Sequence, residues 1–389
     1  MWLGWLLFAV VALWVIPPGL IQFFRQLRPL ADAELNDDDQ RLVSVIMPAR
    51  NEAVCIEQAV RSILASEGIH LELIVVNDRS TDATGAILDR LATEDDRIRV
   101  VHITELPSGW LGKNHAMHLA AETAGGELLL FTDGDIIFQP TAIAAAVHHL
   151  RERGLDHVTL LPRMVHGSLP ESAAIAFFGL AFVIGVQLPL IRTRFPLSYA
   201  GVGAFNLLTA QRYRSFGGHL PLRLNVLDDM QLGRLVKLSG GRQDLLLASD
   251  LLSVRWQPSF WGVVTGLEKN GFASLGYSVW RVMAATVAFF LTMLLPYYWA
   301  ITLAWPQSSG FLATVLLWHS VFTLAAVHAG GSWMVFPLFP LGALTMAFAF
   351  WRSTWITLRN GGVTWRDSFY PLADLRAAQS VLPGEACGK

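Results

Sequence analysis

The sequence predicts an α/β domain that is attached to a membrane, and three observations lead to this prediction. Only 15% of the 389 residues are charged, against about 25% in an ordinary soluble domain. Charged residues are frequent over 35–160 and almost absent from 1–24 and 282–350. Between these apolar ends, short apolar strands alternate with amphipathic helices, a pattern typical of a parallel sheet. Together with a mean hydropathy of +0.43, the composition excludes a disordered or fibrous chain.

The first element is an apolar run over 2–24, which is long enough to span a bilayer. No basic residue precedes this run, so we expect a retained anchor over 1–26 rather than a cleaved signal peptide. Arg25 and Arg28 follow directly. The positive-inside rule then places the next domain in the cytoplasm.

Strands and helices alternate through the domain that follows. The predicted strands lie at 42–47, 71–76, 99–103 and 127–131, and the predicted helices lie at 53–66, directly after Asp82, and at 114–123. In parallel α/β sheets, ligands bind at the carboxyl ends of the strands. The segments after the strands are therefore the first places to search for a site.

These segments are rich in acidic residues. They are PARNE (48–52), NDRSTD (77–82), TDGD (132–135) and, later, LDD (227–229). Asp133 and Asp135 supply hard carboxylate oxygens, which suit a Mg²⁺ or Mn²⁺ ion that bridges a diphosphate. Asp78 can accept a hydrogen bond from a base or a ribose. Two aspartates at this spacing are common by chance. The evidence for a metal site comes from their position, because they directly follow an apolar strand.

Two further segments bear on chemistry. Lys113 begins a helix, where a cation helps to hold a phosphate-bearing ligand, although an ordinary surface lysine is the alternative. Asp228 and Asp229 open another helix. One carboxylate can cap the helix, and the other can act as a general base. His115 and His118 are expected to pack rather than to bind a metal.

Several functions are disfavoured. A net charge of −2 gives no indication of nucleic acid as a partner. Cys55 and Cys387 are too few for a disulfide framework or a cysteine metal site. No Walker A loop is present, and Gly201-Val202-Gly203 lacks the third glycine of a dinucleotide fingerprint. No protein partner is evident.

The C-terminal region, 280–352, contains three apolar stretches near 282–304, 310–329 and 333–350. Three crossings would place the tail, 353–389, on the far side of the membrane from the domain. The arginines of this part of the chain favour the cytoplasmic side instead; they are Arg352, Arg359, Arg366 and Arg376. Either one stretch is re-entrant or in-plane, or the tail breaks the rule.

In this order, the motifs VIMPARNE, VVNDRSTD, FTDGDI, the GGH turn (217–219) and DDMQLGRLVK resemble those of the family 2 glycosyltransferases. The resemblance covers about 42–275 and is strongest to membrane-anchored, lipid-directed members, namely hopene-associated, carotenoid and ceramide glucosyltransferase-like enzymes. It implies a GT-A fold, which is a Rossmann-like and mostly parallel sheet. We therefore expect a GT-A domain over 40–275 between N-terminal and C-terminal transmembrane helices.

The resemblance also implies roles for individual residues. Donor binding would fall to Pro48, Ala49, Arg50, Glu52, Asp78, Lys113, Asp133, Arg255 and Trp256. Asp135, with Asp133, would hold the metal, and Asp229 would match the family's base, with Asp228 as the other member of the pair. The stretch LSVRW (252–256) lacks the glutamine of the Q-x-x-R-W motif found in processive synthases. Processive synthesis is therefore not expected.

A further apolar stretch, 172–191, lies inside the expected domain. Asp135 and Asp229 must act on one sugar, so a single membrane crossing between them is excluded. We expect the stretch to lie in the membrane interface, where it would help to collect a lipid acceptor. A re-entrant segment and a buried core helix are the alternatives.

The resemblance predicts an inverting transferase that moves a sugar from a nucleotide-diphosphate sugar, with UDP-sugar as the expected donor, to a lipid hydroxyl. It would be a multi-pass protein of the cell membrane with its catalytic domain facing the cytoplasm. The alternatives are a polyprenyl-phosphate sugar transferase and, less favoured, a membrane nucleotidyltransferase. A transporter is least favoured, because the apolar stretches carry few ionisable residues.

Overall fold

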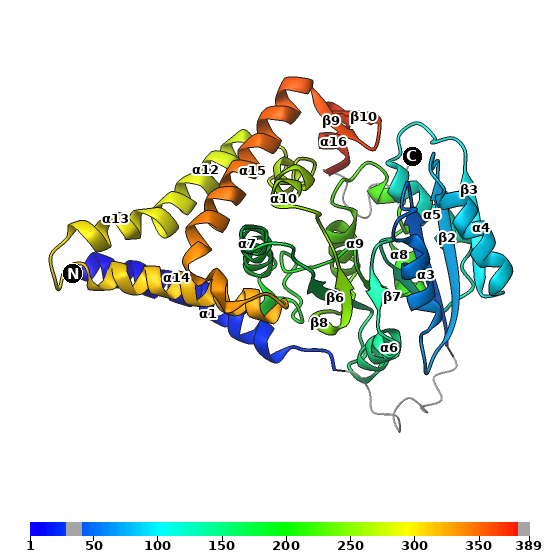
Figure 1. Cartoon of the computed structure of the whole chain (residues 1–389), viewed down its shortest axis with the longest axis horizontal. Helices are drawn as coiled ribbons and strands as arrows, with labels where there is room; N and C mark the ends of the chain where they lie inside the picture. The colour runs from blue at the N-terminus through cyan, green and yellow to red at the C-terminus, as the bar shows by residue number, and fades with distance from the viewer. Residues whose placement is uncertain (29–40, 380–389) are drawn as a thin grey trace. The chain divides into compact units, whose positions relative to one another are not determined.

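The computed structural model describes residues 1–28 and 41–379 of the chain (Figure 1). It divides into two compact units. The helical unit comprises Met1–Phe24, Met164–Pro189 and Trp256–Arg376. The sheet unit comprises the described residues of Arg25–Arg163, Leu190–Arg255 and 377–379. The expected domain over 40–275 is therefore not one unit, because 164–189 and 256–275 belong with the helices.

The described part of the sheet unit forms an eight-stranded sheet in the order β3-β2-β1-β4-β7-β6-β8-β5. Its strands are β1 (Leu42–Ala49), β2 (His70–Asp78), β3 (Ile98–Ile103), β4 (Leu128–Phe131), β5 (Ile137–Phe138), β6 (His157–Met164), β7 (Asn206–Thr209) and β8 (Gln243–Val254). Strands β3, β2, β1 and β4 are parallel. The α/β class and the parallel strands are confirmed. Strand β7 runs antiparallel to β4, which the alternation of strands and helices did not predict.

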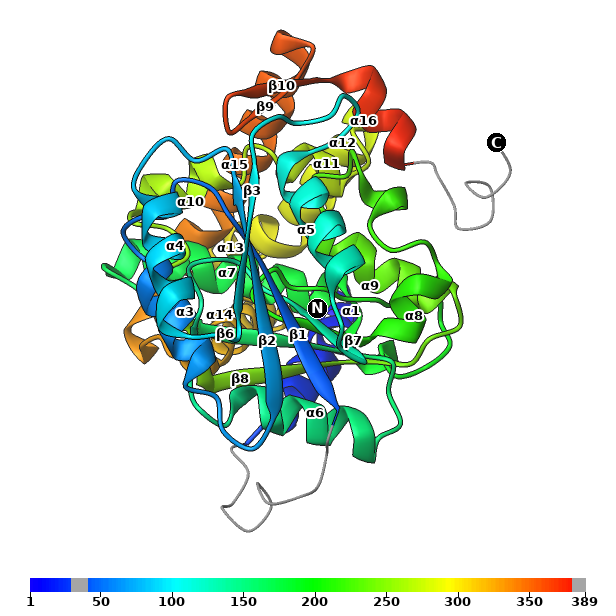
Figure 2. The same ribbon diagram turned by 90° about the vertical axis from the view of Figure 1, so that its right-hand side faces the viewer.

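Strands β1, β2 and β4 are largely buried, and their sequences are rich in apolar residues, as is typical of parallel strands covered on both faces. Helices cover both faces, as Figure 2 shows, with α5, α8 and α9 on one face and α3 and α4 on the other. Their bounds are α3 (Ile56–Leu64), α4 (Thr84–Glu94), α5 (Gly112–Thr123), α6 (Ala142–Glu152), α8 (Ala210–Ser215) and α9 (Asp228–Leu238). These helices pack on the sheet because each has an apolar face. In α3 the buried residues recur at helical spacing and form one apolar stripe; they are Ile56, Ala59, Val60 and Ile63.

The helical unit holds four helical segments that are long and apolar enough to cross a membrane. These are Trp2–Ile21, Val279–Thr302, Ser309–His328 and Trp333–Asn360. The unit also contains α7 (Leu169–Gly185), α10 (Phe260–Gly266), α11 (Gly271–Ser274), the hairpin β9 (Gly362–Trp365) and β10 (Ser368–Pro371), and the start of α16 (Leu372–Gln379). The candidate segments at both ends of the chain agree with the predicted apolar helices.

Helix α7 corresponds to the apolar stretch expected at 172–191. Most of its side chains are buried, and those of Ala173, Phe177 and Leu180 belong to one apolar core with α1 (Trp2–Phe24) and α14 (Ser309–His328). On one side, Phe178 stacks on Trp256 with ring centroids 4.9 Å apart. Helix α7 therefore packs among the other helices of its unit.

Helix α1 runs parallel to α14. A Cβ atom on Gly310 would lie 2.4 Å from the backbone of Gly4, and Gly19 approaches Val321 farther along both helices. The two glycines near the beginning therefore permit a contact between backbones that no larger residue allows. Both helices consequently end on the same side of the helical unit.

Helix α15 (Phe339–Asn360) follows a different course. At its start, Phe339 packs against Trp318 and Phe322, which lie in the middle of α14. Toward its end, the Ser353 hydroxyl accepts a hydrogen bond from the Phe272 amide, which precedes α12 (Val279–Phe289). Helix α15 therefore contacts the middle of α14 at its start and the segment before α12 toward its end.

Candidate functional site

The carboxyl ends of β1, β2 and β4 meet at one edge of the sheet, as the sequence predicts. Pro48 and Ala49 are the last residues of β1. The turn at Gly134 lies against them, since a Cβ atom on Gly134 would be 3.6 Å from the Pro48 carbonyl oxygen and 3.8 Å from Glu52. Asp133 and Asp135 are therefore next to the end of β1.

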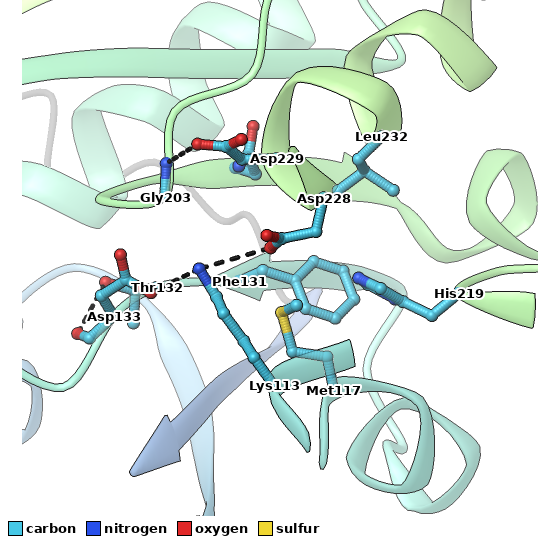
Figure 3. Close-up of a pocket in the computed structure, with 11 residues that line it drawn as sticks. Lys113, Met117, Phe131, Thr132, Asp133, Gly203, His219, Asp228, Asp229 and Leu232 are labelled. Atoms are coloured by element: carbon cyan, nitrogen blue, oxygen red, sulfur yellow. Dashed lines mark hydrogen bonds and ion pairs between the residues drawn. The ribbon is translucent and has the colours of Figure 1, made fainter. Parts of the chain in front are cut away.

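Lys113 lies in the first turn of α5 and joins two of the acidic segments (Figure 3). Its Nζ atom is 2.7 Å from Asp133 Oδ1 and 3.3 Å from Asp228 Oδ2. Burial alone would lower the pKa of Lys113, but the charges of Asp133, Asp228 and Asp229 raise it overall. The lysine is therefore a fixed cation between the strand-end carboxylate and the pair that opens α9.

Gly203 links the same two segments through its backbone. Its amide donates a hydrogen bond to Asp229 Oδ2 at 2.9 Å, and its carbonyl accepts one from the Asp133 amide at 3.0 Å. A Cβ atom at Gly203 would lie 2.5 Å from Asp133 Oδ2, so a glycine is needed at this close approach. The sequence analysis considered Gly203 only within a glycine pattern that it rejected as a dinucleotide fingerprint. The small residues over 200–204 are the signal that could have pointed to it.

Asp228 and Asp229 occupy different environments, although they are adjacent. Asp228 faces Lys113 in a pocket that Met117, Phe131 and His219 also line (Figure 3). Asp229 accepts hydrogen bonds from the amides of Gly203 and Met230. Burial, then the charge of Asp228, raises the pKa of Asp229 to about 6, despite the opposing effect of Lys113. Asp229 is thus ionised at neutral pH and able to accept a proton.

Asp135 is close to other carboxylates. Burial, then the charges of Asp133 and Glu52, raises its pKa to about 7. A divalent cation would relieve this repulsion, and two carboxylates suit Mg²⁺ or Mn²⁺ when substrate phosphates supply the other ligands. Among the described residues, no group of three or more His, Cys, Asp or Glu side chains could hold a metal on its own. Asp133 and Asp135 therefore fit a metal that is shared with a diphosphate.

Asp78 ends β2 and is buried. Its two oxygens accept hydrogen bonds from Arg79 at 2.7 and 3.1 Å, and a Cβ atom on Gly112 would collide with it. Each carboxylate oxygen retains a second lone-pair position. A nucleotide could therefore donate a hydrogen bond to Asp78 while Arg79 keeps its own.

The loops after β1 and β2 support each other. The Asn51 amide donates to the Ser80 hydroxyl, and its side-chain oxygen accepts from the Thr81 amide at 2.8 Å. Asp82 accepts a hydrogen bond from the Ala53 amide. These bonds fix the loop that carries Arg50 and Glu52.

Arg255 and Trp256 follow β8. Trp256 belongs to the helical unit, where it stacks on Phe178, and Arg255 is exposed at the end of the sheet unit. Neither lines the pocket around Lys113. Their donor-binding role remains a prediction from the resemblance.

His219 lines the pocket but was not predicted to do so. The Tyr213 hydroxyl accepts a hydrogen bond from the His219 amide and lies 2.7 Å from His219 Nδ1. Burial lowers the pKa of His219 to about 3. The ring is thus neutral. His118, by contrast, stacks on Trp110, as expected of a packing histidine.

Lys113→Met is expected to weaken the binding of UDP about tenfold, because the site loses its fixed cation while its carboxylates remain. The free energy of unfolding should also fall. Removing one partner of a fully buried ion pair costs roughly 3–5 kcal/mol, and the loss here should be smaller because the Asp133 side chain is 39% exposed. Calorimetric titration and a thermal melt measure both effects. Lys113→Arg is the control and should retain most of the affinity; an unchanged UDP affinity in Lys113→Met would contradict the assignment.

Sequence comparisons find similarity over the part of the chain that carries Lys113 and Asp133. Residues 44–172 match the sequence model described as Glycosyl transferase family 2. The chain is 37% identical over 124 residues to glycosyltransferase AglD of Haloferax volcanii, a match that covers 30% of this chain and 19% of that protein. It is 24% identical over 220 residues to 4,4'-diaponeurosporenoate glycosyltransferase of Staphylococcus haemolyticus, covering 56% and 57% of the two chains.

A third relative is GalNAc(5)-diNAcBac-PP-undecaprenol beta-1,3-glucosyltransferase of Campylobacter jejuni, with 32% identity over 117 residues, or 30% of this chain and 36% of that protein. All three matches span less than two thirds of the relative's own length. Among solved structures, a mannosyltransferase of Pyrobaculum calidifontis in complex with GDP-Man and Mn²⁺ aligns over 91% of this chain and 98% of its own, at 18% identity and a TM-score of 0.49.

Proposed function

The chain contains a glycosyl transferase family 2 domain, and from this premise we propose that it transfers a sugar from a nucleotide-diphosphate sugar to a hydroxyl group of a membrane lipid, with inversion at the anomeric carbon. We propose a UDP-sugar as the donor. The observation that carries the proposal is an arrangement of three side chains: Asp133 pairs with Lys113, and Gly203 links Asp133 to Asp229 through its backbone hydrogen bonds.

The loops after β1 and β2 would bind the nucleotide, with Pro48, Ala49, Arg50 and Glu52 on one loop and Asp78 on the other. Lys113 would attract the donor phosphates. Asp133 and Asp135 would hold Mg²⁺ or Mn²⁺, which supplies a Lewis acid for the leaving diphosphate. Burial, then the charges of Asp133 and Glu52, raises the pKa of Asp135. The repulsion among these carboxylates supports the metal-binding role, because a cation would offset it.

Asp229 would accept the proton of the acceptor hydroxyl. An ionised carboxylate with a raised pKa near 6 is a stronger base than an ordinary aspartate. A polyprenyl-phosphate acceptor is already ionised and needs no base. A basic Asp229 therefore favours a hydroxyl acceptor over a phosphate.

The lipid acceptor is supported by the four candidate membrane segments. One relative is named for diaponeurosporenoate and another for a PP-undecaprenol substrate. Arg25 and Arg28, directly after the first segment, favour a cytoplasmic position for the catalytic domain. We therefore propose a multi-pass protein of the cell membrane.

Mass spectrometry of lipids tests the proposal. Cells with the protein should contain a glycosylated lipid that is absent without it. The purified full chain in nanodiscs should form the same lipid from one UDP-sugar of a panel. A sugar attached through a phosphate would support the polyprenyl-phosphate alternative, and the absence of any sugar transfer would contradict both.

A further inference from the structure

A short segment of the sheet unit exposes apolar and basic side chains together. It comprises residues 192–197 (RTRFPL) and is called the 192–197 loop below. Leu197 is 68% exposed and Phe195 is 39% exposed. Arg194 is exposed beside them. An apolar pair next to a cation is typical of segments that contact a lipid surface.

The base of this loop is held firmly. Lys237 Nζ donates hydrogen bonds to the carbonyls of Ile191 and Thr193, both at 2.6 Å. The Thr193 hydroxyl in turn accepts a hydrogen bond from the Phe195 amide at 3.1 Å. The exposed side chains therefore project from a fixed backbone.

The loop is also tied to the end of the first candidate span. Asp244, whose side chain is fully buried, accepts hydrogen bonds from Arg192 and His149, the latter at 3.0 Å, and forms an ion pair with Arg25 at 3.3 Å. Arg25 directly follows Phe24, the last residue of α1. One carboxylate thus holds the start of the loop beside the residue where the chain leaves α1.

This arrangement sets the level of the loop relative to a bilayer. Helix α1 is long and apolar enough to cross a membrane, and such a crossing would place Arg25 at the height of the lipid headgroups. We propose that the 192–197 loop contacts the membrane surface, with Phe195 and Leu197 inserted among the headgroups and Arg194 paired with anionic lipid phosphates. The inference rests on the membrane location in the proposed function.

The loop also continues directly into the site. Six residues after Leu197, Gly203 bonds to Asp133 and Asp229. A loop anchored in the headgroups would therefore keep the reacting carboxylates close to the surface from which a lipid hydroxyl arrives.

Spin labels on the full chain in vesicles of phosphatidylcholine and phosphatidylglycerol test this contact. In a Cys55→Ser, Cys387→Ser background, one label is placed at Leu197→Cys. Two matched positions serve as controls: Leu13→Cys, 79% exposed on α1, and Thr93→Cys, exposed on α4. Collisions with oxygen report lipid, and collisions with a water-soluble nickel chelate report water.

The label at Leu197 is expected to collide with oxygen in preference to the chelate, as at Leu13, whereas Thr93 shows the opposite preference. Arg194→Gln should increase chelate collisions at Leu197 and leave Thr93 unchanged. If Leu13 reports lipid while Leu197 matches Thr93, the loop inference is wrong although the membrane location holds. If the label at Leu13 itself reports water, the membrane location in the proposed function is wrong, and the loop inference is wrong with it.

Discussion

Asp229→Asn is expected to lower the turnover number by at least about a hundredfold and to leave UDP affinity nearly unchanged. The substitution keeps the size of the side chain and an oxygen that can accept the Gly203 amide, but it removes the basicity. An inverting transfer needs one base opposite the leaving diphosphate, and removing a general base typically costs 10²–10⁴-fold. Turnover and UDP binding are measured side by side.

Asp228→Asn is the matched control, because Asp228 pairs with Lys113 instead of the Gly203 amide. It should mainly lower thermal stability and donor affinity. If Asp228→Asn is inactive while Asp229→Asn turns over normally, the two roles are exchanged. If both variants are active, the chemistry takes place elsewhere.

The same assignment predicts the pH dependence of the wild-type enzyme. A base must be deprotonated to accept a proton, and the pKa of Asp229 is raised to about 6. The rate should therefore fall as the pH drops below about 6. A pH–rate profile of kcat/KM measures this limb, which should be absent from the residual activity of Asp229→Asn.

Removal of divalent metal is expected to abolish transfer, and Mn²⁺ or Mg²⁺ should restore it. The donor diphosphate is anionic, and it must approach Asp133, Asp135 and Glu52. Burial, then the charges of Asp133 and Glu52, already raises the pKa of Asp135 to about 7. Lys113 alone cannot neutralise this charge, because it is paired with Asp133 and Asp228. Transfer is measured after treatment with EDTA and after each metal is returned.

Asp135→Asn should weaken metal and donor binding more than it lowers turnover at saturating donor. Thr93→Ala, on the outer surface of α4, is the control and should behave as the wild type. Full turnover in metal-free protein with EDTA would show that the carboxylates act without a cation.

The edge of the sheet that carries the site could be predicted, because parallel strands bring their carboxyl ends together whatever their separation in sequence. That rule places the segments after β1, β2 and β4 side by side, including Asp78 and Asp133. Lys113 could be located because an apolar strand and a turn precede its helix. The positions of Asp78, Asp133 and Lys113 could be predicted because each follows from the strand and helix pattern of its own segment.

Gly203 could not be predicted, because its position depends on a pairing between distant strands. Strand β7 runs antiparallel to β4, with Asn206 opposite Phe131, and this brings 200–205 to the end of β4. Hydropathy likewise could not show that α7 packs among other helices, since apolar segments in a core and in a bilayer have the same composition.

The residues after α1 have a consequence for anyone who wishes to prepare a soluble catalytic fragment. Gln26 pairs with Leu247 of β8, and the Leu27 amide donates a hydrogen bond to the Leu247 carbonyl at 2.8 Å. A fragment cut at residue 40 would leave these backbone groups of β8 without partners, and such strand edges promote aggregation. It would also remove Arg25 from the buried Asp244. A fragment that begins at Arg25 keeps the hydrogen bonds to Leu247 and the ion pair with Asp244.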